Sequence, residues 1–417
     1  MNDYIYGQGD GLLTKDGRRL FPIGFYELPQ GDAELAAMAE SGVNLVRCGN
    51  EDGLDRVGAL DMMGWVSLPV HSGVTDSLRE RVESLVDHPA LAVWEGPDEI
   101  VWNFTAFSHL WRKDKIGVFE HKREWWMQTP LVIEYSEKKA SEIIPNMREA
   151  IRLVRSLDKH NRQFWINEAR DSDLKFVRQY IDEVDITGCD DYPVAVDSHN
   201  VSRVGSSTER WKQVGRGRPV WMVLQGFSWS DLDETPGDPA YPTFAESRLM
   251  AYNCIAHGAR GILYWGSSYM KSPGHEAFRE SLYALTSELS ALQPFLTAPE
   301  ERYVQVRPIE AKRATDTMPG HESGLPPVEL GVRMTARRTG RDWLIILVNE
   351  DNRIQMGVEV SGLNALNGME FCLLYGDETV TVNNGELITR MKPLEVKVFA
   401  TGQRWETHRL NGRDFAE

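Results

Sequence analysis

The sequence has few cysteines and no long apolar run, and both shortages limit what the protein can be. Its 417 residues include four cysteines, far apart and without Cys-x-x-Cys spacing. This pattern indicates neither a zinc site nor a disulfide framework, so we expect the four cysteines to act as small buried hydrophobic residues. No segment approaches the about 18 consecutive apolar residues of a membrane helix, and no basic stretch followed by an apolar core opens the chain. We therefore expect a soluble, cytoplasmic protein that binds no membrane.

Basic residues are also in deficit. There are 46 Lys and Arg against 62 Asp and Glu, a formal charge of −16, which argues against nucleic acid as a ligand. The chain lacks a glycine-rich phosphate loop, a Gly-x-Ser-x-Gly elbow and convincing metal-ligand spacing, so we expect neither a cofactor nor a metal. Aromatic residues are plentiful, with 13 Trp, 13 Tyr and 14 Phe. They suit both a packed core and stacking on sugar rings.

Apolar strand-like runs alternate with helical periodicity over the first two thirds of the chain. Parallel strands need helical crossovers, so eight alternations in about 280 residues predict an α/β fold, a (β/α)8 TIM barrel, over residues 1–298. The expected strands are residues 21–28, 43–49, 65–71, 91–99, 162–169, 184–193, 219–229 and 259–268.

Two segments depart from that alternation. Residues 299–405 contain short period-two runs separated by turn signals, which predict a C-terminal antiparallel β-sandwich, followed by a polar tail at 406–417. At about 100–135 the barrel carries an insertion rich in tryptophan, including Trp102. We expect this insertion to form a wall or lid of the site, or else an extra helical pair packed on the flank of the barrel.

The run LAVWEGPDE at 91–99 ends in two adjacent carboxylates, Asp98 and Glu99. Residues just past the carboxyl end of a barrel strand line the active site, so these acids are the candidate catalytic residues. The alternative is that Asp98 caps the next segment while Glu99 is a solvated loop acid. If the pair is catalytic, we expect burial and the charge of Asp98 to raise the pKa of Glu99, as a general acid requires.

The segment HPALAVWEGPDE resembles the fourth strand of retaining (β/α)8 glycoside hydrolases, in which a glutamate at this position is the acid/base. In the large clan that uses two glutamates, Asn precedes the acid and a second Glu ends the seventh strand. Here these residues are Asp98 and Gln225. An Asp directly before the acid is similar to the substrate-assisted β-N-acetylhexosaminidases, including a β-N-acetylgalactosaminidase family. That resemblance implies a sugar acetamide as nucleophile, oriented by Asp98, with Glu99 as acid/base.

Other candidates lie at the ends of further strands. Asp190, Asp191 and Tyr192 end the sixth expected strand in GCDDYP, where they could contact sugar or form a cap and turn before Pro193. Gln225 could hydrogen bond to hydroxyls or to the acetamide. Adjacent strand residues face opposite ways, so one of Tyr264 and Trp265 should contact the sugar and the other the core. The remaining substrate-binding candidates are Tyr26, Arg47, His71, Trp229 and Trp102. For several of them the alternative is a structural role, which is the more common one for such residues.

We therefore expect an exo-acting, retaining β-N-acetylhexosaminidase, with galactosamine preferred on the resemblance alone. One alternative is a two-carboxylate β-glycosidase that pairs Glu99 with Asp190, Asp191 or Glu168. The other is a barrel that binds glycans without cleaving them. In each case the partner is a carbohydrate, and the sequence leaves a homo-oligomer open.

Overall fold

The structure is a computed structural model that describes residues 9–105, 130–233, 238–313, 331–408 and 410. Within these residues eight parallel strands form a closed barrel in the order β11-β12-β3-β4-β5-β6-β7-β8, which confirms the predicted TIM barrel. The barrel strands are β3 (Ile23–Phe25), β4 (Leu45–Arg47), β5 (Met63–Ser67), β6 (Leu91–Glu95), β7 (Gln163–Ala169), β8 (Ile186–Asp191), β11 (Val220–Gln225) and β12 (Gly261–Trp265).

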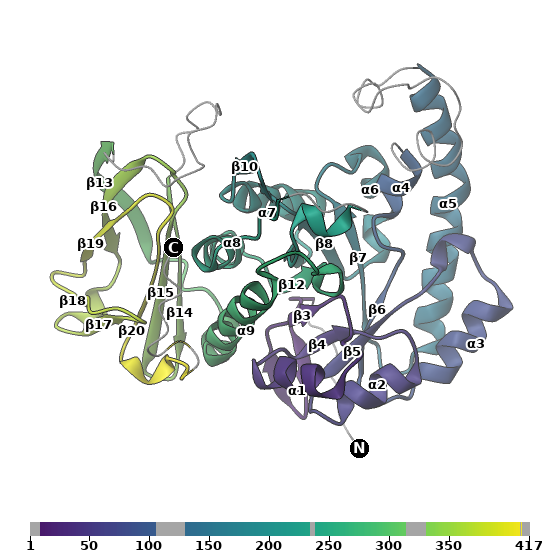
Figure 1. Cartoon of the computed structure of the whole chain (residues 1–417), viewed down its shortest axis with the longest axis horizontal. Helices are drawn as coiled ribbons and strands as arrows, with labels where there is room; N and C mark the ends of the chain where they lie inside the picture. Colours follow the sequence, from purple (N-terminus) through teal and green to yellow (C-terminus); the bar gives the residue numbers. More distant parts are fainter. Residues whose placement is uncertain (1–8, 106–129, 234–237, 314–330, 409, 411–417) are drawn as a thin grey trace. The chain divides into compact units, whose positions relative to one another are not determined.

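Helices α1 to α8 lie between successive barrel strands, as parallel strands require, and α9 and α10 follow the last of these strands. They are α1 (Asp32–Glu40), α2 (Glu51–Gly58), α3 (Asp76–Leu85), α4 (Ile100–Thr105), α5 (Pro130–Leu157), α6 (Leu174–Tyr180), α7 (Arg203–Val214), α8 (Phe244–Ala256), α9 (His275–Ala291) and α10 (Gln293–Leu296). Figure 1 shows α2, α3 and α5 outside the strands β4 to β7. No helix in the described part of the chain is both long and apolar enough to cross a membrane.

Short elements lie between the barrel elements. They are the strand pairs β1 (Leu13–Lys15) with β2 (Arg18–Leu20) and β9 (Val194–Ala195) with β10 (Ser198–His199), and the short helical turns η1 (Val70–Ser72), η4 (Ile181–Glu183), η5 (Trp229–Leu232) and η6 (Ser267–Tyr269).

Several predicted boundaries are wrong. The fourth strand ends at Glu95, four residues before the predicted end, and β5 ends at Ser67, so that His71 lies in η1. Helix α5 begins at Pro130, inside the segment expected to belong to the aromatic insertion. Of the aromatic insertion, only α4 and the start of α5 lie within the described residues, and 106–129, which carry the other three tryptophans, lie outside them.

Strand alternation determines which side chains fill the barrel. Trp65, Trp165 and Trp221 are fully buried on one face of β5, β7 and β11, with ring centroids 5.9 Å apart for the first pair and 5.1 Å for the second. The Trp221 indole donates to the carbonyl of Gly11, so the segment before β1 packs against this core. Residues two positions further along these strands, such as Ser67 and Asn167, share the inward face and lie nearer the carboxyl end.

The C-terminal strands form two antiparallel sheets, as predicted for a sandwich. One sheet has the order β13 (Gln305–Arg313), β16 (Ile354–Ser361), β19 (Leu387–Met391); the other has β14 (Val332–Thr339), β15 (Asp342–Asn349), β20 (Val396–Ala400), β17 (Glu370–Leu373), β18 (Thr379–Thr381). Buried Trp343, Val358, Phe371 and Phe399 belong to one hydrophobic cluster between them. Figure 1 shows the two sheets face to face. The short turns η7 (Asn364–Leu366) and η8 (Gln403–Trp405) complete this region.

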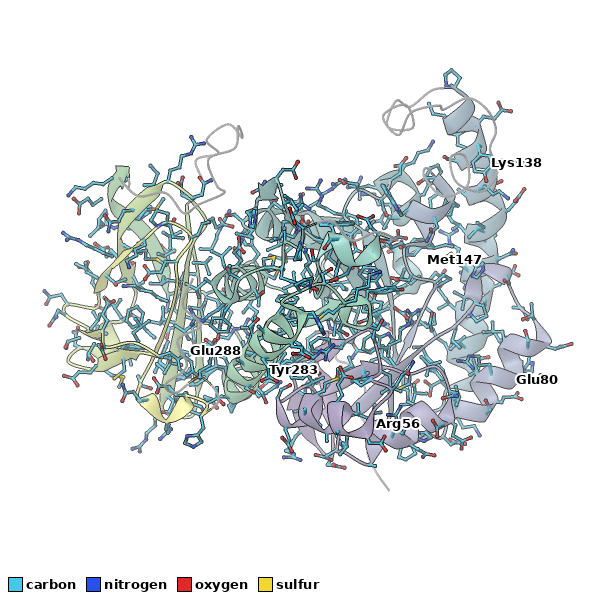
Figure 2. The ribbon with its side chains drawn as sticks, in the orientation of Figure 1. Arg56, Glu80, Lys138, Met147, Tyr283 and Glu288 are labelled. Atoms are coloured by element: carbon cyan, nitrogen blue, oxygen red, sulfur yellow. The ribbon has the colours of Figure 1, made fainter. Side chains whose placement is uncertain are left out.

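The chain divides into two compact units that cut across the barrel strands. Residues 1–18, 44–191 and 210–223 form the first unit, and 19–43, 192–209 and 224–417 form the second. The predicted domain boundary at residue 298 stays a prediction. In the second unit, α9 carries Tyr283 and Glu288, two of the residues labelled in Figure 2. Tyr283 packs edge-on against Phe25, and Glu288 forms a buried ion pair with Arg248, with Nη2 and Oε1 2.8 Å apart.

Candidate active site

A buried glutamate that sequence reasoning missed ends the fourth barrel strand. Trp94 faces outward, where its indole donates to Asp158, so Glu95 faces into the barrel. Glu95 is fully buried, and Arg47 Nε lies 3.0 Å from its Oε2. Burial raises the pKa of Glu95 to about 8 although Arg47 lowers it. The strand alternation of LAVWE could have indicated this residue, had the strand been ended at Glu95.

The predicted catalytic pair lies on the loop that follows. The Gly96 N–H donates to the Trp165 carbonyl at 2.8 Å, and the Glu99 N–H donates to the Asn167 carbonyl at 2.9 Å, so β7 holds both ends of the loop. Glu99 has φ 49°, in the left-handed region that a side chain with a Cβ rarely adopts. Such strain costs of order 1–3 kcal/mol and persists only where its surroundings impose it, as at active sites.

Asn167 connects the loop to the sixth strand. Its Nδ2 donates to Asp98 Oδ1 at 3.0 Å and to Asp190 Oδ2 at 2.9 Å. Asn167 is buried, and its Oδ1 has no hydrogen-bond partner among the described residues. Glu99 and Asp190 lie close enough for each to influence the pKa of the other. Asp98, Glu99 and Asp190 with Asn167 form what we call the carboxyl cluster, all within the first unit.

The electrostatics of this cluster suit an acid. Burial and the charge of Asp98 raise the pKa of Glu99 to about 7, which confirms the direction expected from the sequence. Burial and neighbouring Glu99 raise the pKa of Asp190 well above its usual range. A general acid is most effective when its pKa lies near the working pH, so Glu99 could donate and recover a proton near neutrality.

The other acids predicted near the site face the opposite way. Asp191 is buried on the outward face of β8. Burial lowers the pKa of Arg170, but the charges of Asp191 and Asp171 outweigh this effect and raise it. The Glu168 carboxylate accepts from Ser172 Oγ and Tyr180 Oη, both at 2.8 Å, and from two backbone N–H groups that begin α4. Glu168 therefore binds the N-terminal backbone of α4. This structural role does not support pairing of Glu168 with Glu99 in catalysis.

A cluster of aromatic rings lies in the second unit, around the end of β12. Trp265 stacks on Tyr192 with ring centroids 5.6 Å apart, and buried Phe227 contacts the edges of the rings around it. Tyr269 packs on Trp265 at 5.3 Å. Trp229 and Tyr269 are 44% and 47% exposed, values that leave much of both ring surfaces to solvent. Stacked rings with exposed faces are suited to sugar binding.

Two of the candidate residues are fully buried. The Gln225 amide is fully buried: it accepts from the Val194 N–H and donates to the carbonyls of Val194 and Phe227, so it has no donor left for a ligand. These contacts do not support a substrate-binding role for Gln225, which stays a prediction. Tyr264 is fully buried and stacks on Phe25, which leaves Trp265 as the member of that pair outside the core.

The remaining candidates lie near strand ends. Tyr26 is buried, and its N–H donates to the Tyr264 carbonyl. His71 is half-buried, with its pKa lowered by burial. Trp102 is half-buried in α4. None of these contacts assigns a substrate, so their binding roles stay predictions.

Two acids of the second unit, Glu27 and Asp231, accept hydrogen bonds from the backbone of loops that follow barrel strands. The sequence analysis did not assign them this role. Glu27 accepts from the N–H groups of Gly266 and Ser267 directly after β12. Asp231 accepts from the N–H groups of Ser228, Lys271 and Ser272, which joins the loop after β11 to the loop after β12. The Ser228-x-x-Asp231 spacing is a capping box and could have indicated the second role.

No protein-family model and no curated protein matches this chain. Among solved structures, a β-galactosidase from Bacillus circulans sp. alkalophilus is similar with a TM-score of 0.53 at 10% identity, over 92% of this chain and 99% of that chain. A glycoside hydrolase family 5 protein from Bacteroides vulgatus is similar with a TM-score of 0.52 at 12% identity, over 99% and 94%.

A β-galactosidase from the psychrophilic Marinomonas ef1 is similar over 65% of this chain with 12% identity and a TM-score of 0.43. The chain spans about 60% of the length of that protein. The similarity to the Bacillus circulans and Bacteroides vulgatus proteins shows that this chain shares their fold. Within its described residues, no group of three or more His, Cys, Asp or Glu side chains is arranged to hold a metal ion.

Proposed function

We propose that this chain is an exo-acting, retaining β-N-acetylhexosaminidase that uses the acetamide of its substrate as nucleophile. The observation that carries the proposal is the carboxyl cluster, in which Glu99 has a pKa of about 7 directly after Asp98. Asp98 is half-buried and is held by the Asn167 amide, as a side chain that orients a substrate group must be. The galacto configuration follows only from the resemblance of the segment HPALAVWEGPDE.

The proposed reaction has two steps. Glu99 protonates the glycosidic oxygen and the bond from that oxygen to the anomeric carbon breaks, while the acetamido oxygen bonds to that carbon. Asp98 accepts the acetamido N–H and stabilises the positive charge of the oxazolinium ring. The Glu99 carboxylate then takes a proton from water, whose oxygen bonds to the anomeric carbon and opens the ring. The β configuration and the protonation state of Glu99 are both restored.

The structure weakens the two-carboxylate alternative. Asp190 is buried, and its Oδ2 is engaged by the Asn167 amide. Glu168 is enclosed by its donors, Asp191 faces Arg170, and Gln225 cannot form a glycosyl ester. The buried Glu95 is the acid that this alternative would have to use.

The experiment is hydrolysis of paired chromogenic β-glycosides that differ only at C2, with acetamido or hydroxyl, in galacto and gluco forms. We expect turnover of acetamido substrates alone, lost by at least about 10²-fold in Asp98→Ala and Glu99→Gln. Asp171→Asn, which removes a carboxylate from a loop outside the cluster, should behave as the unmodified protein. Equal cleavage of the hydroxyl substrates would overturn the proposal and point to Glu95. Binding without turnover would favour a glycan-binding barrel.

A further inference from the structure

The proposed reaction does not use the aromatic rings of the second unit, two of which are exposed. Trp229 and Tyr269 are 44% and 47% exposed, and we call them the outer rings. The inner rings, Tyr192 and Trp265, are half-buried and stack on each other with centroids 5.6 Å apart. Exposed aromatic surface of this kind marks a place where a ligand or a partner binds.

The outer rings belong to different loops and contact different inner rings. Trp229 lies in η5, after β11, and its ring centroid is 6.3 Å from that of Tyr192. Tyr269 lies in η6, after β12, and packs on Trp265 at 5.3 Å. Among the described ring contacts, none joins Trp229 directly to Tyr269. A ligand that covers both outer rings must therefore extend across the inner pair.

The loop that carries Tyr269 is fixed where it leaves β12. The half-buried Glu27 accepts from the N–H of Gly266 at 2.8 Å and from the N–H of Ser267 at 3.0 Å. Gly266 has φ 103°, in the region that favours glycine, and a Cβ there would lie 2.5 Å from Cδ1 of Phe227. The backbone therefore lies directly on this buried ring, which holds the start of the loop against the aromatic cluster.

Asp231 joins this loop to the loop that carries Trp229. The Asp231 side chain is 1% exposed, and its Oδ2 accepts from the N–H of Ser228, the N-cap of η5, at 3.0 Å. Its Oδ1 accepts from the N–H groups of Lys271 and the residue after it, at 3.1 and 2.9 Å. Trp229 is two residues before Asp231, and Tyr269 is two residues before Lys271. One buried carboxylate therefore sets the separation of the outer rings.

The position and type of these rings favour a carbohydrate as the ligand. Both loops follow the carboxyl ends of barrel strands, where TIM-barrel proteins bind their substrates. Trp and Tyr combine a flat apolar face, which suits the C–H face of a sugar, with an N–H or O–H that can meet its hydroxyls. Loops that are fixed before binding also reduce the entropy lost when a flexible chain of sugars binds.

We propose that Trp229 and Tyr269 bind two sugar residues of one oligosaccharide, and that Asp231 is a positioning residue that sets the separation of the two rings. This inference rests on the proposed function, from which it takes a carbohydrate as the ligand. It specifies the substrate class, because a single sugar cannot cover both outer rings whereas an oligosaccharide can. The preferred substrate is then a longer glycan that ends in an N-acetylhexosamine.

The test is calorimetric titration with β-linked N-acetylglucosamine and N-acetylgalactosamine oligomers of one to four sugars. The full chain carries Glu99→Gln in every titration, so that the oligomers are not cleaved. For the oligomer series that binds best, we expect Kd to be at least about tenfold lower for the tetramer than for the single sugar. Trp229→Ala and Tyr269→Ala should each reduce this ratio to less than about threefold.

Variants of Asp231 test its positioning role. Asp231→Ala keeps both outer rings but unlinks their loops, so the ratio should fall to less than about threefold while binding of the single sugar is unchanged. Asp231→Asn keeps one acceptor oxygen and should retain a larger ratio than Asp231→Ala. Tyr303→Ala is the matched control, because Tyr303 is a 57% exposed tyrosine in the segment before β13. Denaturant unfolding checks that each variant is folded.

Four results would overturn the inference. The first is a Kd that does not depend on oligomer length, and the second is a length dependence that Trp229→Ala and Tyr269→Ala leave intact. The third is a lower free energy of unfolding in Asp231→Ala with an unchanged ratio, which would show that Asp231 only supports the fold. The fourth is a dimer of the unmodified protein in sedimentation that Trp229→Ala dissociates, which would make the rings an interface between copies.

The titration does not depend on turnover. If no acetamido glycoside is hydrolysed but the oligomers bind with the expected length dependence, the proposed reaction is wrong and the inference holds. If acetamido glycosides are hydrolysed and the ratio is the same in every variant, the proposed reaction holds and the inference is wrong.

Discussion

The proposed chemistry depends first on a single residue, because Glu99 must hold a proton near neutral pH. Burial and Asp98 raise its pKa to about 7, so the acid form is lost as the pH rises through that value. We predict that kcat/KM for acetamido substrates falls about tenfold per pH unit above about pH 7. Initial rates across pH check this. A profile that stays level to pH 9 would contradict the assignment of Glu99 as the acid.

At this scale the sequence predicts some residues of the site and misses others. The adjacent acids Asp98 and Glu99 follow an apolar run, so their position could be predicted from local pattern alone. Glu95 was missed because the run was taken as one strand up to residue 99, which hides that Glu95 shares the inward face of Leu91 and Val93. Asn167 and Gln225 could not be ranked, because their hydrogen-bond partners come from other strands.

Among the elements, the loop 96–99 decides where the catalytic pair lies. A Cβ on Gly96 would lie 2.5 Å from Cγ1 and 2.7 Å from Cδ1 of buried Ile166, too close for any contact. We predict that Gly96→Ala displaces the loop, lowers activity at least about tenfold and lowers the free energy of unfolding by about 1–3 kcal/mol. Glycoside hydrolysis and denaturant unfolding measure the two effects.

Gly331→Ala is the control for that substitution, since a Cβ there meets no atom within 4 Å. If Gly96→Ala and Gly331→Ala have equal activity and stability, the prediction is contradicted. The loop then tolerates the methyl group without moving Asp98 and Glu99.

The order and type of the barrel elements could be predicted from the sequence, because apolar runs and helical periodicity are local features. The ends of the strands could not. Beyond Glu95 the chain still hydrogen bonds to β7, through the N–H groups of Gly96 and Glu99, so the pattern of the sequence continues where the strand has ended. Helix α5 begins at Pro130, inside the segment that was assigned to the aromatic insertion, because the tryptophan-rich composition there hid the start of the helix.

For the whole molecule, buried glutamates link stability to pH. Burial raises the pKa of Glu95 from 4.5 to about 8. Because Glu95 binds its proton more tightly in the folded state, it contributes stability that is fully present below about pH 4.5. This contribution is lost as the pH rises toward 8. We predict that the free energy of unfolding decreases over this pH range, with Glu95 contributing at most about 1.4 kcal/mol per pH unit. The free energy of unfolding of Glu95→Gln should decrease less steeply over the same range.

Denaturant unfolding at several pH values tests that linkage. Glu137→Gln is the control, because Glu137 is exposed and paired with Lys175 at the surface. If Glu95→Gln and Glu137→Gln follow the same pH dependence as the unmodified protein, Glu95 is ionised in the folded state and its pair with Arg47 dominates over burial.

The most direct test of the proposed function is the rate of hydrolysis of substrates whose acetamido methyl carries zero, one, two or three fluorine atoms. Fluorine withdraws electrons from the acetamido oxygen and makes it a weaker nucleophile. If that oxygen attacks the anomeric carbon, kcat/KM should fall with each added fluorine, by about 10²-fold or more over the series. Rates that are independent of fluorine would show that the acetamide is not the nucleophile and would contradict the substrate-assisted mechanism.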